Sequence, residues 1–135
     1  MDLIDRLYEV INAMPEMANI QLFANTPREF ESISILEAPG SHVLGSYMDG
    51  TEEKQMNYEV TFKSSTAGNA KNVLWAISQK LNDLSELSSG DGSFIFEDLT
   101  VDSEPFMSDQ DEQFIYYSLD FYVKALTKKK LKGRY

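Results

Sequence analysis

The feature that most constrains the fold is an unbroken alternation of apolar and polar residues between positions 54 and 63. The apolar members are Met56, Tyr58, Val60 and Phe62, and the polar members are Gln55, Asn57, Glu59, Thr61 and Lys63. Successive side chains of a strand point to opposite faces, so this period of two predicts a strand with one buried and one solvated face. Such strands are typical of antiparallel sheets.

A second long strand is predicted over residues 113–125. One face would carry Ile115, Tyr117, Leu119, Phe121 and Val123, and the other Phe114, Tyr116, Ser118, Asp120 and Tyr122. Shorter apolar segments predict further strands at residues 19–24, 30–37, 42–48 and 93–99. The Asp49 and Gly50 pair predicts a tight turn between two of the strands.

Two segments carry apolar residues at helical spacing. The first covers residues 2–14, with Asp2 as a candidate cap and Pro15 as the stop signal. The second covers residues 67–84, and its apolar stripe is Ala70, Val73, Leu74, Ile77, Leu81 and Leu84. The element order predicts an α+β fold over residues 1–126, in which a mainly antiparallel sheet packs against two amphipathic helices.

Charge divides the chain into an acidic body and a basic end. Residues 1–123 contain all 22 acidic residues and six basic ones, a net charge of −16, whereas the last twelve residues carry +6. An acidic body disfavours binding to nucleic acid or to anionic membranes. Residues 102–112 are predicted to form an acidic loop and residues 127–135 a flexible basic tail.

Several classes of chemistry lack the residues that they require. The chain has no cysteine, no apolar segment long enough to cross a bilayer, and no recognisable signal peptide. His42 is the only histidine, and a local hydrogen bond is the simplest role for it. Carboxylates such as Glu97, Asp98, Asp102 and Glu104 could pair by chance in so acidic a chain. We therefore expect no catalytic residues, no cofactor and no metal.

Two groups of aromatic residues lie where polar residues are expected. Trp75 falls on the polar face of the second helix, beside Lys71 and Gln79. Phe114, Tyr116 and Tyr122 lie on the nominally solvated face of the last strand. Each group is covered by another segment of this chain or forms a contact with another chain, since aromatic residues are enriched at interfaces.

The basic tail also has two interpretations. Its charged residues are Lys128, Lys129, Lys130, Lys132 and Arg134. Such a tail is a flexible, solubilising end or docks on acid. The acid would belong to a neighbouring copy of the body or to DNA phosphates.

The order of these elements resembles a known family. An amphipathic helix and short strands precede the Met56–Phe62 strand, and a helix then leads through a glycine-rich turn into residues 94–96. A loop containing Pro105 and the long strand through Val123 close the domain. This order resembles the tail terminator or minor capsid (neck) proteins of long-tailed phages of Gram-positive bacteria, over about residues 1–126.

The resemblance implies a virion protein without catalysis, assembled in the bacterial host cytoplasm. Tail terminators form a ring, usually a homo-hexamer, at the head-proximal end of the tail tube. There the ring stops polymerisation of the major tail tube protein and meets the head connector. DNA passes through the ring without specific binding, and no membrane is involved.

Such a ring needs two different patches on each subunit, for which the Trp75 and Phe114 groups are candidates. Its lumen would repel DNA if acidic side chains lined it. The candidates for that lining are Asp49, Glu52, Glu53, Asp109, Asp111 and Glu112. The main alternative is an acidic adaptor or DNA-mimic protein that binds a basic site on a partner, and a small enzyme that uses paired carboxylates is a third reading.

Overall fold

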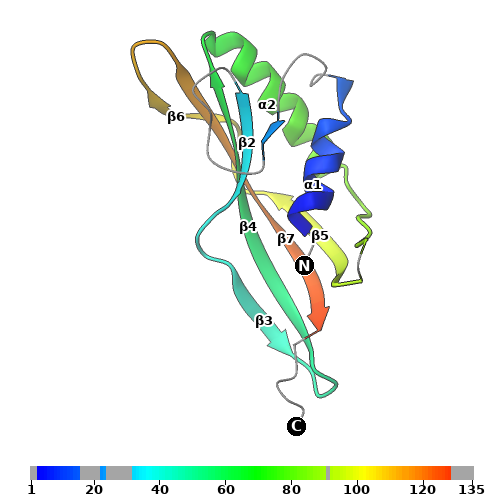
Figure 1. Ribbon diagram of the computed structural model, residues 1–135. Coiled ribbons are helices and arrows are strands. Elements are labelled where there is room, and N and C mark those ends of the chain that lie inside the picture. Colours follow the sequence, from blue (N-terminus) through cyan, green and yellow to red (C-terminus); the bar gives the residue numbers. More distant parts are fainter. Residues whose placement is uncertain (1–2, 16–21, 24–31, 91, 129–135) are drawn as a thin grey trace.

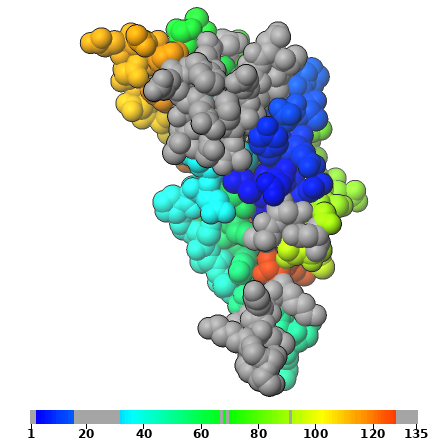
Figure 2. Space-filling model, viewed as in Figure 1, coloured from blue at the N-terminus to red at the C-terminus, as the bar shows by residue number. Residues whose placement is uncertain are grey.

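The computed structural model describes residues 3–15, 22–23, 32–90 and 92–128. It shows an α+β fold in which a twisted, mainly antiparallel sheet carries two helices on one face (Figure 1). The fold class therefore agrees with the prediction from the sequence. The molecule is elongated, with both helices near one end and a hairpin reaching to the other (Figures 1 and 2).

The spine of the sheet is a pair of long antiparallel strands, β4 (Thr51–Ser64) and β7 (Ile115–Lys128). They pair without interruption from Thr51 opposite Lys128 to Ser64 opposite Ile115. In this register Tyr58 lies opposite Phe121, and their rings stack with centroids 5.6 Å apart. The alternating apolar residues of both strands thus face the same side and form one layer of the core.

Shorter strands extend this spine on both edges. On the outer edge of β4, β2 (Ser32–Glu37) pairs with its second half and β3 (His42–Ser46) with its first half. On the outer edge of β7, β6 (Phe106–Gln110) pairs with its first half and β5 (Phe94–Val101) with its second half. The short strand β1 (Leu22–Phe23) adds parallel pairing to β2. The remaining residues of the strand predicted at 19–24 lie outside the described residues.

Helices α1 (Leu3–Asn12) and α2 (Ala67–Asn82) cover the apolar face of the sheet (Figure 1). In α2 the predicted stripe is buried at Ala70, Val73, Leu74, Ile77 and Leu81, whereas Leu84 lies beyond the end of the helix and is partly buried. In α1 the buried residues are Leu3, Leu7 and Ile11. They pack against the apolar layer of β4 and β7 in one continuous core. The candidate cap Asp2 lies outside the described residues.

The opposite face of the sheet is less solvated than the alternation predicts. Toward the end of β4, Thr61 and Lys63 are buried, and Ser118 on the neighbouring β7 is fully buried. The Thr61 hydroxyl lies 3.1 Å from that of Ser118, which donates a hydrogen bond of 2.7 Å to Ser108 of β6. The prediction of a fully wet face is therefore wrong, because side-chain hydroxyl contacts across β4, β7 and β6 shield this part of it.

The acidic loop predicted at residues 102–112 contains strand β6. Every residue of β6 is exposed, so the segment lacks the apolar alternation that identifies half-buried strands. It is a strand because its backbone pairs with β7, and a backbone pairing leaves no pattern in the sequence. At the other end of the chain, β7 runs through Lys128, past the predicted start of the tail at residue 127. Residues 129–135 lie outside the described residues.

Candidate functional site

His42 has the local role expected of it. Its Nδ1 donates a hydrogen bond of 2.7 Å to the carbonyl oxygen of Gly40, two residues earlier, and the side chain is exposed. Within the described ranges, no three His, Cys, Asp or Glu residues group as metal ligands would. Likewise, none of the helices described is both long and apolar enough to cross a membrane.

Carboxylates do approach one another on the polar face of the sheet, although not in the pairs considered from the sequence. Glu59 and Asp120 lie directly opposite each other on β4 and β7. Burial raises the pKa of Asp120, and the nearby charges of Glu59 and Asp102 raise it further. The Thr61 hydroxyl donates a hydrogen bond of 3.0 Å to Glu59. Two carboxylates placed opposite each other repel when both are charged, and the raised pKa of Asp120 reflects that repulsion together with burial.

Trp75 lies on the outer side of α2 with 45% of its surface exposed. Lys71 and Gln79, its neighbours on the predicted polar face, are exposed as well. Because α2 covers the apolar face of the sheet, Trp75 points away from the sheet. A contact between this patch and another chain stays a prediction.

The aromatic residues on the opposite face of the sheet are half-buried and have cationic neighbours. The Lys63 ammonium lies 4.5 Å from the centroid of the Phe114 ring and 5.8 Å from that of Tyr116. Lys124 lies 6.0 Å from the centroid of Tyr122. Lysine side chains of this chain thus contact the rings of Phe114, Tyr116 and Tyr122 through cation–π interactions. The Trp75 patch and this aromatic group lie on opposite sides of the layered domain.

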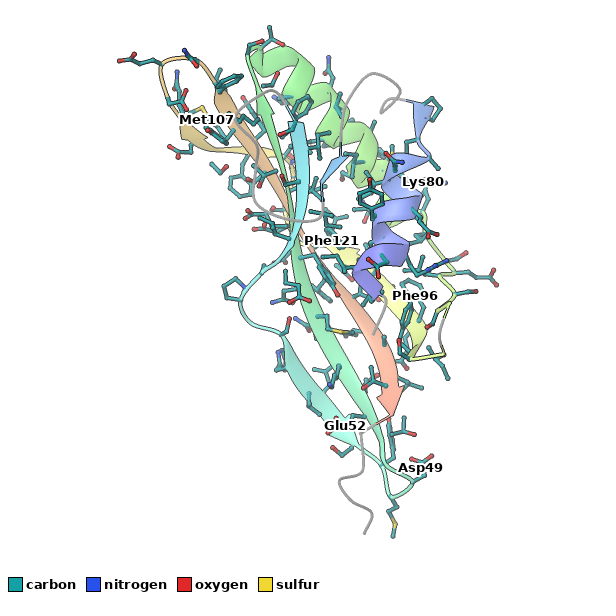
Figure 3. All side chains as sticks on the ribbon, in the orientation of Figure 1. Asp49, Glu52, Lys80, Phe96, Met107 and Phe121 are labelled. Atoms are coloured by element: carbon teal, nitrogen blue, oxygen red, sulfur yellow. The ribbon has the colours of Figure 1, made fainter. Side chains whose placement is uncertain are left out.

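The acidic residues proposed for a lumen divide between two hairpins at opposite ends of the molecule. Asp49, Glu52 and Glu53 belong to the β3–β4 hairpin, whereas Asp109, Asp111 and Glu112 belong to the β6–β7 hairpin (Figures 1 and 3). The structure therefore does not bring the two groups together within one subunit.

Some of these carboxylates also organise the turns that present them. Asp111 accepts hydrogen bonds from the backbone N–H groups of Phe114, at 2.7 Å, and Gln113, at 2.8 Å, and these bonds lower its pKa. Asp49 accepts one from the N–H of Thr51 at 2.9 Å. Of the basic tail, Lys128 pairs through its backbone at the end of β7, and Lys129, Lys130, Lys132 and Arg134 lie outside the described residues.

Exposed apolar side chains on the β3–β4 hairpin were not predicted from the sequence. These side chains are Val43, Leu44, Tyr47 and Met48, of which Met48 is fully exposed. A signal was present, because Tyr47 and Met48 directly precede the Asp49 and Gly50 turn. Large apolar residues beside a tight turn have no sheet face to be buried against.

A groove between the two helices was not predicted either. The end of α1 and the second half of α2 enclose about 400 Å³. The lining is apolar apart from one lysine: Val10, Ala13, Met14, Pro15, Ala76, Lys80 and Leu84. The apolar stripes predicted that the helices pack against the sheet, but they did not indicate a groove between the two helices.

Comparison with known proteins identifies the fold. No protein-family model matches the chain, and no curated protein matches it significantly. Among solved structures, a chain from the "Virion of native gene transfer agent (GTA) particle" is similar, with a TM-score of 0.65 and 14% sequence identity. The match covers 92% of this chain and 94% of that chain. The two chains therefore share one α+β architecture from end to end.

Proposed function

We propose that the chain is a non-enzymatic virion assembly protein of a phage, and specifically a tail terminator. The observation that carries the proposal is the end-to-end structural likeness to a chain of a phage-like particle, in which neither chain has a large unmatched domain. The element order, which resembles tail terminators of phages of Gram-positive bacteria, supports the same function. A fold alone hosts many roles, so the finer assignment needs a direct test.

In this proposal the chain forms a homo-hexameric ring at the head-proximal end of the tail tube. A ring requires a head-to-tail contact between two different patches on each subunit. The exposed Trp75 on the helix side and Phe114 with its aromatic neighbours on the sheet side lie on opposite faces, as such a contact needs. The major tail tube protein would meet one end of the ring and the head connector the other.

DNA would pass through this ring without specific binding. Acidic residues at both hairpins would give the lumen negative charge at two levels, because the hairpins lie at opposite ends of each subunit (Figure 1). Negative charge repels phosphates and so lets the duplex slide. The basic tail would dock on the acidic body of a neighbouring copy. Assembly would take place in the host cytoplasm, and the protein would remain in the virion.

Multi-angle light scattering of the purified protein tests the proposal. We expect a monomer–hexamer equilibrium that shifts toward the hexamer as the protein concentration rises or when purified tail tubes are added. A monomer that ignores tail tubes and instead inhibits a DNA-binding enzyme would contradict the proposal and favour the DNA-mimic alternative. A thermal shift specific to one divalent metal would favour the enzyme alternative.

A further inference from the structure

The end of the β3–β4 hairpin is a hydrogen-bonded turn in which Met48 is fully exposed. The Tyr47 N–H donates to the Thr51 carbonyl at 2.8 Å, and the Gly50 N–H donates to the Tyr47 carbonyl at 3.1 Å. Gly50 has a φ of 89°, which L side chains rarely adopt. These bonds fix the backbone on both sides of Met48. A preorganised apolar residue loses little conformational entropy when it binds, so this turn is suited to insertion.

Methionine is well suited to such an insertion. Its side chain is unbranched, has three rotatable bonds and ends in a polarisable thioether, so it fills irregular apolar sites. Met48 is fully exposed, and Tyr47 beside it is 55% exposed. Val43 and Leu44 of β3, 46% and 40% exposed, precede them on the same hairpin, and we call these four residues the hairpin tip surface. An isolated exposed apolar residue is ordinary, but a cluster on a projecting hairpin indicates a binding surface.

The groove between α1 and α2 has the complementary properties. Its lining is apolar except for Lys80, and its volume of about 400 Å³ is within the range of sites that bind small apolar groups. Lys80 makes no ion pair with any residue that the structure describes. The hairpin tip, in contrast, has a net negative charge, because Asp49, Glu52 and Glu53 follow Met48 within five positions. Lys54, whose ammonium lies 4.0 Å from a carboxylate oxygen of Glu52, offsets part of that charge. Both polarity and charge therefore match between the two surfaces.

The two surfaces lie at opposite ends of the molecule. Figure 3 labels Lys80 beside the helices and Asp49 at the far end of the long hairpin. The hairpin of one chain cannot reach its own groove, so any contact between them joins two copies. We propose that the hairpin tip of one copy inserts Met48 into the α1–α2 groove of a second copy, with Lys80 facing the acidic turn.

This contact is heterologous, since each copy offers both a hairpin tip and a groove. Successive copies would therefore join head to tail and form either a closed ring or an open chain. The inference deepens the proposed function and rests on it only for the closure of that chain of copies into a ring. In such a ring the acidic turn at Asp49 lies in the contact between copies, and the negative charge of the lumen comes from the β6–β7 hairpin.

Disulfide crosslinking tests the contact directly, because the natural chain has no cysteine. The test pair is Met48→Cys with Ala76→Cys in one chain, which places one thiol at the hairpin tip and one in the groove. On mild oxidation we expect a ladder of disulfide-linked oligomers. The matched control pair is Met48→Cys with Ile95→Cys, since Ile95 is 66% exposed on β5 and does not line the groove. The test pair should react about tenfold faster than the control.

Charge variants give a second readout. Met48→Asp and Lys80→Glu should each shift the mass measured by light scattering from oligomer to monomer. Met48→Asp would place a charge in the apolar groove, and Lys80→Glu would place a carboxylate opposite the acidic turn and repel it. Both residues lie at the surface, so thermal unfolding should be unchanged. Ile95→Asp, which adds the same charge at another exposed apolar position, should leave the oligomer intact. Equal effects of Met48→Asp and Ile95→Asp would overturn the inference.

The outcomes separate this contact from the proposed function. A wild-type hexamer in which the Met48→Cys and Ala76→Cys pair does not crosslink would overturn the contact and leave the ring intact. A ladder that grows without a closed species would confirm the contact and contradict the ring. Crosslinking of Met48→Cys to the tail tube protein alone would assign the tip to that partner and overturn the inference, as would a monomer without any crosslink.

Discussion

The two halves of strand β4 both pair with β7 through antiparallel hydrogen bonds, but helices cover only one of them. The second half, Met56–Ser64, lies beneath the helices, and its apolar residues are buried. The first half, Thr51–Gln55, is part of a hairpin that no helix covers (Figure 1), and the apolar side chains at its end are exposed. Burial stabilises one half, whereas turn geometry and backbone pairing form the other. A hairpin with uncovered apolar residues is suited to binding and contributes little to the core.

The largest expected effect is in the covered half. Phe62 is fully buried in the core, and Phe62→Ala should lower the free energy of unfolding by about 3–5 kcal/mol through lost burial and the remaining cavity. Met48→Ala, the matched change at the exposed end, should alter it by less than about 0.5 kcal/mol. Urea unfolding followed by fluorescence measures both. Similar losses for the two variants would contradict the contrast between the halves.

A smaller effect is expected at the turn of the hairpin. Gly50→Ala places a side chain at a φ of 89°, which should cost about 1–2 kcal/mol locally. Because the helices do not pack on this turn, the loss should appear as faster amide hydrogen exchange in residues 43–55, with little change in α2. Gly68→Ala on α2 is the control, since its φ is not positive and a methyl group would meet no atom within 4 Å. Uniformly faster exchange throughout the chain would show that the hairpin and core unfold as one unit.

The pH dependence of stability should report the repulsion between Glu59 and Asp120. The pKa of Asp120 is raised in the folded chain, so between its ordinary and raised values the folded state binds a proton that the unfolded state releases. Stability therefore falls as the pH rises through that interval. Asp120→Asn should stabilise the protein at pH 7 by less than about 1 kcal/mol, and the gain should vanish at a pH below the ordinary carboxyl pKa. A gain that persists in acid would assign the effect to packing.

The smallest expected effect is that of Trp75→Ala. With 45% of its surface exposed on the outer side of α2, this side chain contributes little to the core, so unfolding should change by less than about 0.5 kcal/mol. Oligomerisation measured by light scattering should weaken instead. A large loss of stability would show that Trp75 is a core residue.

The covered half of the molecule was predictable from its sequence and the hairpin only in part. Periodicity identified the buried faces of α1, α2, β4 and β7, because burial leaves a pattern in the residues. Strand β6 was missed because all of its side chains are exposed and only backbone pairing forms it. The burial of Ser118 was not predicted, because a serine in the sequence is equally compatible with a solvated position and with a buried, hydrogen-bonded one.

The candidate site shows the same limit. The helical wheel placed Trp75 away from the buried stripe of α2, but it left open whether another segment of the chain covers this side chain, which is 45% exposed. The groove and the hairpin tip could not be predicted, since each depends on how elements far apart in the sequence meet in space. The groove forms where the end of α1 meets α2, and the tip is uncovered because both helices lie over the other part of the sheet (Figure 1).

The most direct test of the proposed function is electron microscopy of the particles made after the gene for this chain is deleted. If the protein is a tail terminator, tails should be abnormally long and variable and should be separate from DNA-filled heads. Expression of the wild-type chain from a plasmid should restore tails of uniform length. Tails of normal length joined to heads in the deletion strain would contradict the account.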